Sequence, residues 1–251
     1  MKSRRIDKME LRDRLYRRRY LLPNAVTVAN MFCGFLCMIY AASDRFEKAA
    51  VAIGLAILLD GLDGRVARKL NATSKFGGEF DSFSDFISFG IAPAVLMYHW
   101  CFRVMADEFG VLVNFVFVIC AASRLARFNL SEENLASFEG LPTPGAAGVI
   151  AAIVNFLPHP EPGVILIGAG AALVLALAYL MVSTESFLSI KEVKITRMQL
   201  QTRLLVALLI ALLWYNSQVG FVVLAALYLM AMPIKRYLEK RSVRLTVRKA
   251  A

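Results

Sequence analysis

The sequence predicts an all-α protein, a polytopic bundle of about eight transmembrane helices with both termini in the cytoplasm. Apolar residues make up 58% of the 251 residues and charged residues only 19%, whereas soluble domains are nearer half and a quarter. The apolar residues are gathered into runs, several of which approach the roughly 20 residues that cross a bilayer as a helix. The basic residues that flank these runs fall mostly on one side of the predicted membrane. Together these observations exclude an ordinary soluble domain.

The apolar runs define the predicted elements in chain order. Turn-forming residues separate neighbouring runs, as in the segment 155–163 and at Tyr215-Asn-Ser-Gln. The runs 144–157 and 203–216 are shorter than a full crossing prefers. We interpret the pattern as a six-helix catalytic core plus two further spans, with six spans in all if the last pair is miscounted. The predicted runs are 22–42, 46–66, 80–101, 109–128, 144–157, 163–183, 203–216 and 218–234.

The distribution of charge predicts the orientation and the outer segments. With the N-terminus in the cytoplasm, every Lys and Arg except Arg45, Lys48 and Arg103 falls on the cytoplasmic side, as the positive-inside rule requires. The sequence thus divides into a basic segment 1–21, a transmembrane catalytic domain 22–234 and a basic cytoplasmic tail 235–251. The first segment is either a short amphipathic helix on an anionic membrane surface or a plain basic tail.

The net charge of +10 would also suit a nucleic-acid-binding protein. The basic residues, however, flank apolar spans and do not alternate with aromatic residues on a polar face, so we expect no nucleic-acid partner. The four cysteines lie in or beside apolar runs and form no C-x-x-C pair, which is typical of small buried apolar residues. We therefore expect a protein of the cytoplasmic (inner) membrane whose partner is the lipid bilayer.

Two pairs of acids lie at the end of the second run and at the start of the third. Asp60 and Asp63 are three residues apart, and Asp81 and Asp85 are four apart, so on helices each pair lies on one face. Two such faces would form an oxygen cage for hard divalent cations. Solvated acids near helix ends are the alternative for any one of them. For all four that alternative is weak, because acids beside a membrane span are unfavourable and usually functional.

Small residues and one cation continue the first acidic face. Gly64 and Ala67 leave room for a ligand, and Arg68 offers a planar guanidinium suited to a phosphate. Written out from Asp60 to Asp85, the stretch reads D-x-x-D-G-x-x-A-R-x8-G-x-x-x-D-x-x-x-D. It resembles the signature of the CDP-alcohol phosphotransferases at every defined position, and fixed gaps make it a specific match.

Two more segments extend the resemblance from about Leu22 to Gly148. Leu-Pro-Asn opens the first span, and the segment 121–148 contains Ala-Ser-Arg-Leu-Ala-Arg-Phe-Asn followed by Gly-Leu-Pro-Thr-Pro-Gly. Within the family they are similar to the bacterial and archaeal integral-membrane phosphatidylserine synthases. Gly-Leu-Pro-Thr-Pro-Gly cannot continue a helix. It therefore predicts an ordered, non-helical re-entry segment that leads into the next, tightly packed span.

The resemblance implies that CDP-diacylglycerol and L-serine give phosphatidylserine and CMP, at an active site that faces the cytoplasm. Two Mg²⁺ or Mn²⁺ ions would be held by Asp60, Asp63, Asp81 and Asp85, and Asp85 would also act as the base. A homodimer is implied as well. The residues expected to contact the CDP-lipid are Gly64, Ala67, Arg68, Ser74, Gly77, Asn24 and Thr27. The residues alone leave two roles open for Asn24 and Thr27. Either they line the acidic cavity, or they hydrogen-bond one helix to another.

The acceptor alcohol is less well determined, because the acidic motif serves every alcohol of the family. Arg124 and Arg127 either bind an anionic group of the acceptor or are snorkelling interface anchors. Glycerol 3-phosphate, inositol and inositol phosphate are the alternative acceptors. A cation-coupled transporter is a remote alternative, since transporters place such acids near the midplane, often within inverted repeats. Here the acids lie at one edge, and no repeat is visible.

Overall fold

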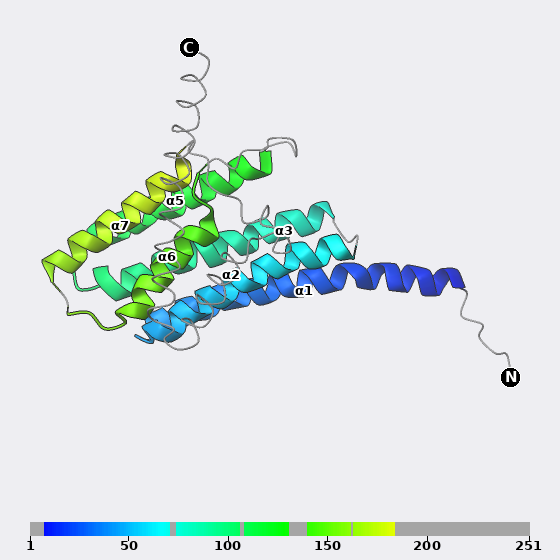
Figure 1. The fold of residues 1–251 in the computed structure, drawn as a ribbon, viewed down its shortest axis with the longest axis horizontal. Helices are drawn as coiled ribbons and strands as arrows, with labels where there is room; N and C mark the ends of the chain where they lie inside the picture. The colour runs from blue at the N-terminus through cyan, green and yellow to red at the C-terminus, as the bar shows by residue number, and fades with distance from the viewer. Residues whose placement is uncertain (1–7, 71–73, 106–107, 131–139, 162, 184–251) are drawn as a thin grey trace, which may run out of the picture.

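The computed structural model describes residues 8–70, 74–105, 108–130, 140–161 and 163–183. All regular elements within these ranges are helical, and they run as one bundle (Figure 1). In chain order they are α1 (Lys8–Ala42), α2 (Phe46–Lys69), α3 (Lys75–Asp85), the π-helical η1 (Phe86–Ile91), α4 (Ala92–Met97), the π-helical η2 (Tyr98–Phe102), α5 (Phe109–Leu130), α6 (Thr143–Phe156) and α7 (Val164–Val182).

Each of the first six predicted runs corresponds to a helical segment. Four segments are both long and apolar enough to cross a bilayer: Pro23–Ala42, Lys75–Phe102, Phe109–Leu130 and Val164–Val182. Helix α6 has only 14 residues, and α2 carries Asp60 and Asp63 toward its end. The fold is therefore an all-helical bundle with four candidate spans among the described residues. The runs 203–216 and 218–234 and the tail 235–251 lie outside those residues, so the eight-span count stays a prediction.

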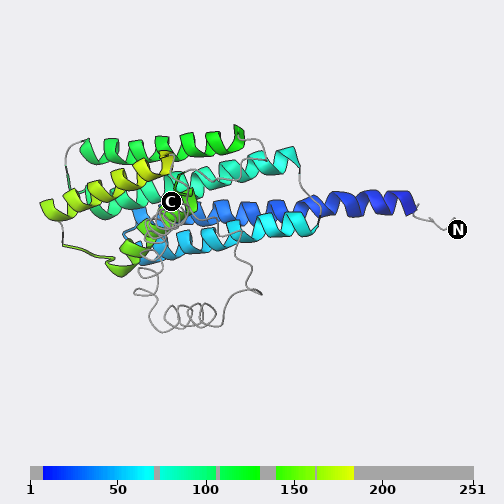
Figure 2. The same cartoon turned by 45° about the horizontal axis from the view of Figure 1, so that its top comes forward.

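Most of the helices lie side by side along the length of the bundle, and the short α6 is inclined to them (Figures 1 and 2). Helices α1 and α2 form an antiparallel hairpin and make the most extensive helix pair, α6 packs on α2, and α7 packs on α5. The segment from α3 to η2 continues as one helical path, and its α3, η1 and α4 parts pack against α1. The carboxyl end of α2 and the start of α3 thereby meet beside α1.

The contact between α1 and η1 is close because Gly34 has no side chain. A Cβ at Gly34 would lie 2.6 Å from the Ser88 hydroxyl oxygen and 2.7 Å from its Cα atom. The Ser88 hydroxyl donates a hydrogen bond of 3.1 Å to the carbonyl oxygen of Asn30 on α1. Small residues with such interhelical bonds are typical of membrane bundles, where close backbone approach replaces the hydrophobic drive.

The predicted re-entry before α6 is confirmed. Gly140 has a φ of 81°, a left-handed conformation that glycine adopts readily. The next residue, Leu141, is fully buried, and its amide donates a 2.9 Å hydrogen bond to the carbonyl oxygen of Leu180 on α7. Helix α6 then begins at Thr143, with Pro144 in its first turn, where the missing amide hydrogen is tolerated.

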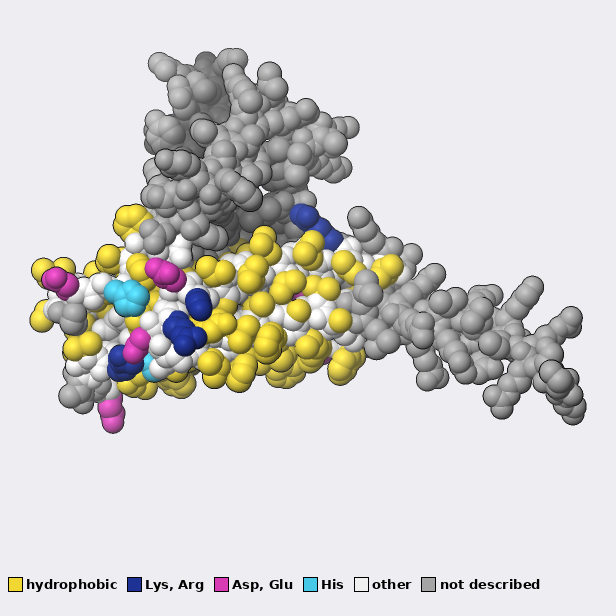
Figure 3. Space-filling model, turned by 90° about the horizontal axis from the view of Figure 1, so that it is seen from below, with side chains coloured by type: hydrophobic (Ala, Val, Ile, Leu, Met, Phe, Trp, Pro, Cys, Tyr) yellow, Lys and Arg dark blue, Asp and Glu magenta, His cyan; other side chains and the backbone are white. Residues whose placement is uncertain are grey.

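The outer surface of the hairpin is apolar over most of its length. Figure 3 shows this surface as a broad field of hydrophobic side chains, with most of the charged side chains gathered at one end. The exposed apolar residues of the hairpin are Val28, Phe32, Phe35 and Ile39 on α1 and Val51, Leu55, Leu58 and Leu62 on α2. An apolar surface of this extent suits contact with lipid.

Candidate active site

The two predicted acidic faces meet in the structure. One carboxylate oxygen each of Asp60 and Asp63 on α2 and of Asp81 on α3 lie within 4.8 Å of one another. Asp85, one helical turn beyond Asp81, interacts with Asp60 and Asp81. The four acids, drawn from two helices, therefore share one site.

The carboxylates of this site are buried without full hydrogen bonding. Asp63 is 5% exposed, and one of its oxygens accepts the backbone N–H of Gly64. Its other oxygen and one oxygen of Asp85 are buried without a hydrogen-bond partner in the part of the chain that the structure describes. Buried, unsatisfied acceptors of like charge are unfavourable. A divalent cation with oxygen ligands would relieve both penalties, so this donor set fits Mg²⁺ or Mn²⁺.

Two serine hydroxyls hold the acidic helix against α1. Ser84 donates a 3.1 Å hydrogen bond to the carbonyl oxygen of Thr27, one turn before the bond from Ser88 to Asn30. The Thr27 hydroxyl donates to the Pro23 carbonyl within α1. These serines lie on the same stripe as Asp81 and Asp85, but the sequence does not reveal their partners. Immediately after Asp85 the helix becomes π-helical, as is frequent at functional sites.

Three of the residues expected to contact the CDP-lipid lie together at the start of α3. Ser74 is the N-cap of α3, and its hydroxyl oxygen accepts a 3.0 Å hydrogen bond from the Gly77 amide. A Cβ at Gly77 would lie 3.1 Å from that oxygen and 3.7 Å from the side-chain oxygen of Asn24 on α1. The absence of a side chain at Gly77 therefore lets both oxygens lie close to its backbone. Capping of α3 is a structural role of Ser74 that sequence reasoning missed, although an N-cap serine is a recognisable signal.

The remaining residues of the motif lie in the last two turns of α2. Gly64 directly follows Asp63 and is half-buried, while Ala67 and Arg68 belong to the final turn, which ends at Lys69. The backbone of this turn is helical as predicted. The side chains of residues 67–69 lie outside the description, so the contact of Arg68 with a phosphate stays a prediction.

Arg124 and Arg127 contact the two helices that follow α5. The Arg124 guanidinium donates to the Thr143 hydroxyl over 3.4 Å, and Arg127 donates to the Val182 carbonyl oxygen over 3.3 Å. Both arginines thus lie on the side of α5 that meets the start of α6 and the end of α7. Arg124 is half-buried and Arg127 is exposed.

One pair of polar residues beside the acids was not anticipated. The Ser82 hydroxyl and the Asn129 amide are hydrogen-bonded, with the amide nitrogen 3.0 Å from the hydroxyl oxygen. Ser82 follows Asp81, so this bond links the acidic helix to the end of α5. The only signal in the sequence is Asn129 itself, the last residue of the Ala-Ser-Arg-Leu-Ala-Arg-Phe-Asn segment.

Fold and site together define a helical membrane protein with a carboxylate site for hard cations where α2 ends and α3 begins. The sequence profile of the CDP-alcohol phosphatidyltransferase family matches residues 20–184, which include the whole site.

Curated relatives match over ranges of similar or greater length. A CDP-diacylglycerol–serine O-phosphatidyltransferase of Helicobacter pylori (strain ATCC 700392 / 26695) is 36% identical over 218 residues, covering 84% of this chain and 88% of that protein. An enzyme of the same name from Bacillus subtilis (strain 168) is 35% identical over 171 residues, covering 68% of this chain and 92% of the relative. An archaetidylserine synthase of Methanothermobacter thermautotrophicus is 34% identical over 164 residues, covering 63% of this chain and 69% of that protein.

The chain belongs to the CDP-alcohol phosphatidyltransferase family. It is therefore a metal-dependent transferase of phospholipid biosynthesis, embedded in a membrane by its apolar helices. This family membership removes the cation-coupled transporter from consideration.

Proposed function

We propose that the protein transfers the phosphatidyl group of CDP-diacylglycerol to the hydroxyl of L-serine, giving phosphatidylserine and CMP. The carboxylate oxygens of Asp60, Asp63 and Asp81 within 4.8 Å of one another carry this proposal. A diphosphate needs such a concentration of hard-cation ligands. The names of the curated relatives support serine as the acceptor.

We propose that the four acids hold two Mg²⁺ or Mn²⁺ ions. The charge balance supports this number, because four carboxylates neutralise two divalent cations. Bound there, the cations would stabilise the charge on the diphosphate and on the departing CMP. Asp63, whose second oxygen is buried without a partner among the described residues, would be a ligand in this arrangement. Relief of the repulsion among the carboxylates would favour binding.

In the proposed reaction Asp85 accepts the proton of the serine hydroxyl. The serine oxygen then forms a bond to the phosphorus of the phosphatidyl group, and the bond from that phosphorus to the CMP oxygen breaks. The leaving CMP takes the electron pair. One oxygen of Asp85 is buried without a hydrogen-bond partner among the described residues, which supports its availability for the proton.

Binding of the CDP-lipid would use groups on both sides of the acids. Arg68 would offset the charge of the diphosphate, and the open backbone at Gly64 and Gly77 would admit it. The proximity of Ser74, Gly77 and Asn24 supports a common pocket for the cytidine portion. The complete proposed set is Asn24, Thr27, Gly64, Ala67, Arg68, Ser74 and Gly77.

The acceptor would bind near the carboxyl end of α5. Arg124 and Arg127 would provide cationic partners for the serine carboxylate, although their contacts with Thr143 and Val182 also suit a role in helix packing. The same arginines would suit glycerol 3-phosphate or inositol phosphate, and inositol itself is a further alternative. Serine is favoured because the curated relatives are named for serine or archaetidylserine.

In the cell, we propose that the domain 22–234 lies in the cytoplasmic (inner) membrane as a homodimer. The active site faces the cytoplasm, flanked by the basic segments 1–21 and 235–251. The skewed distribution of Lys and Arg supports this orientation.

The proposal is tested by measuring CMP release from CDP-diacylglycerol with Mg²⁺ or Mn²⁺. L-serine, glycerol 3-phosphate, inositol and inositol phosphate are offered separately. We expect release with serine alone, and its loss on addition of EDTA. Release with another alcohol would keep the family chemistry and overturn serine, while no release from folded protein would overturn the whole proposal.

The role of Asp85 is tested by Asp85→Asn, which preserves the shape of the side chain. We expect CMP release to fall by about 100-fold or more because the base is lost. Binding of CDP-diacylglycerol, measured by its effect on thermal unfolding, is expected to persist. Loss of binding along with turnover would assign Asp85 to the metal ions alone.

A further inference from the structure

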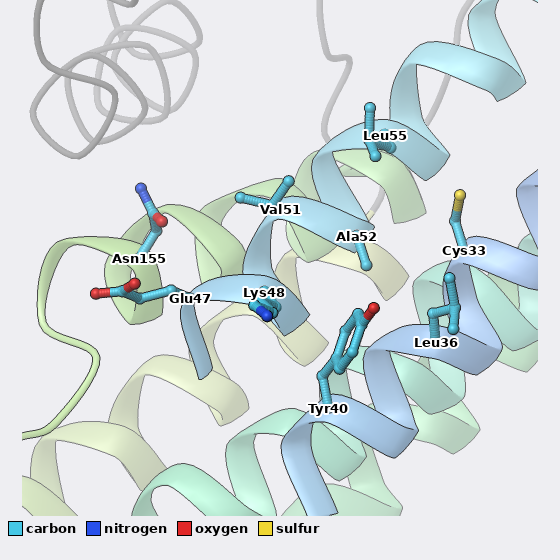
Figure 4. A pocket seen from close by; sticks show the side chains of 9 residues that line it. All are labelled: Cys33, Leu36, Tyr40, Glu47, Lys48, Val51, Ala52, Leu55 and Asn155. Atoms are coloured by element: carbon cyan, nitrogen blue, oxygen red, sulfur yellow. The ribbon is translucent and has the colours of Figure 1, made fainter. Parts of the chain in front are cut away.

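At the end of the bundle opposite the acids, α1, α2 and α6 border a groove of about 450 Å³ (Figure 4). Lys48, at its rim, precedes Asp60 by three helical turns of α2, which is about 18 Å along the axis. The inner end of the groove at Leu55 lies five residues before Asp60 on α2, but none of the four acids lines the groove, so it is distinct from the acidic site.

The groove is polar at one end and apolar at the other. Glu47 and Lys48, in the first turn of α2, lie at the charged end of the bundle, whereas Leu55 lies two turns further along α2, about 10 Å deeper. Leu36 of α1 lines the facing wall. Val51 and Leu55 are 46% and 49% exposed, so the groove opens onto the apolar outer surface of the hairpin.

The polar end of the groove has unused hydrogen-bonding and charged groups. Asn155 of α6 lines it, is only 5% exposed, and has an amide nitrogen without a hydrogen-bond partner in the described ranges. A buried donor of this kind is unfavourable unless a ligand accepts its hydrogen bond. Neither Glu47 nor Lys48 forms an ion pair with another side chain that the structure describes.

We propose that this groove binds one zwitterionic phospholipid with a primary ammonium headgroup, from the leaflet opposite the acidic site. The lipid phosphate contacts Lys48 and accepts a hydrogen bond from Asn155, and the ammonium group contacts Glu47. One acyl chain lies along Val51 and Leu55. The lining of the groove changes from polar to apolar along its length, as a phospholipid does from its headgroup to its tail.

Charge complementarity selects this class of lipid. A zwitterionic headgroup matches a cation and an anion at neighbouring positions, whereas an anionic headgroup would be repelled by Glu47. A trimethylammonium headgroup cannot donate hydrogen bonds to the Glu47 carboxylate. A soluble polar ligand would leave the apolar wall at Val51 and Leu55 unused. A lipid held by three helices would stabilise their packing, because it binds only the folded state.

The first test measures thermal unfolding of the full chain in detergent with added phosphatidylethanolamine, phosphatidylcholine or phosphatidylglycerol. We expect phosphatidylethanolamine to raise the midpoint by about 3 °C or more, and the other two lipids to raise it less. Glu47→Lys should transfer the preference to phosphatidylglycerol, with CMP release in detergent unchanged. Glu108→Lys makes the same charge change outside the groove and should keep the original preference. The proposal would be overturned if all three lipids raised the midpoint equally. It would also be overturned if Glu47→Lys and Glu108→Lys had the same effect on the lipid preference.

The second test identifies the occupant in vesicles. Phosphatidylethanolamine with a photoreactive acyl chain should label the peptides that contain residues 33–55, as mapped by mass spectrometry. Val51→Trp fills the groove and should abolish this labelling, whereas Val111→Trp, on the exposed face of α5, should not. A photoreactive residue at position 51 that captures residues 203–234 or a second copy of the chain, without lipid labelling, would show that protein fills the groove instead.

Discussion

The two ends of the bundle use charged side chains in opposite ways. At the end near the α1–α2 turn, Arg103 and Asp44 form an ion pair with a nitrogen-to-oxygen distance of 3.0 Å. At the other end, Asp60, Asp63 and Asp81 bring their carboxylate oxygens within 4.8 Å of one another. The first arrangement is favourable in itself, whereas the second becomes favourable only when a cation is bound. Like charges held together in this way indicate function.

Hydrogen bonding does not separate the two ends as charge does, because Asn155, at the end near the α1–α2 turn, also keeps a buried amide nitrogen without a partner among the described residues. The Trp100 indole, near the ion pair, donates a 2.8 Å hydrogen bond to the Leu157 carbonyl oxygen. Asp63 and Asp85 each keep one buried oxygen without a partner in the described part of the chain. Repulsion among the carboxylates, rather than missing hydrogen bonds, therefore distinguishes the acidic end, and the rest of the bundle must hold that end in place.

The strongest way to test this comparison is Asp63→Asn. Removal of one carboxylate should lower CMP release by about 100-fold or more, because a metal ligand is lost. In EDTA the variant should unfold at the same temperature as the wild type or higher, because repulsion among the acids is reduced. Activity assays and thermal unfolding with and without Mg²⁺ measure both effects.

Mg²⁺ is expected to stabilise the wild type, by about 2.7 kcal/mol at a hundredfold excess over its dissociation constant. The Asp63→Asn variant should gain clearly less. A variant that is less stable than the wild type in EDTA, yet gains as much from Mg²⁺, would contradict a repulsive metal site.

A smaller effect is expected from Gly34→Ala, which tests the support of the acidic helix. The new Cβ would lie 2.7 Å from the Ser88 Cα atom, so α1 and η1 must move apart, at a cost of about 1–3 kcal/mol of stability. CMP release should fall as well, because the hydrogen bonds that position α3 are stretched. Chemical unfolding and activity assays check the two expectations.

Gly61→Ala is the matched control, since nothing lies within 4 Å of a Cβ at that position of α2. It should raise stability by about 0.5–1 kcal/mol through helix propensity and leave the helix packing intact. Equal destabilisation by both substitutions would show that the close contact of Gly34 with Ser88 is unimportant.

The smallest effect is expected at the opposite end, from Asp44→Asn. Asp44 has a φ of 57°, which asparagine also tolerates, so only the ion pair with Arg103 is weakened. The two side chains are 50% and 47% exposed, and exposed pairs contribute about 0.2–1 kcal/mol. Unfolding should shift slightly and CMP release should not change. A large loss of activity would show that the two ends are coupled.

The sequence predicts the helical segments well and their exact ends less well. The six helical segments follow from the apolar runs, because backbone groups in lipid must be bonded within a helix. Their ends are less accurate. The third segment begins at Lys75 rather than at residue 80, because Ser74 caps a first turn that is not apolar.

The sequence by itself determined the helical membrane class, the two acidic faces and the family motif, because helical spacing and hydropathy are local properties. Only the tertiary structure decided that α2 and α3 face each other, that Ser84 and Ser88 bond to carbonyl oxygens of α1, and that Gly34 must be small. It also assembled the groove at Asn155 from three helices. These features depend on residues far apart in the chain, whose partners are set by packing.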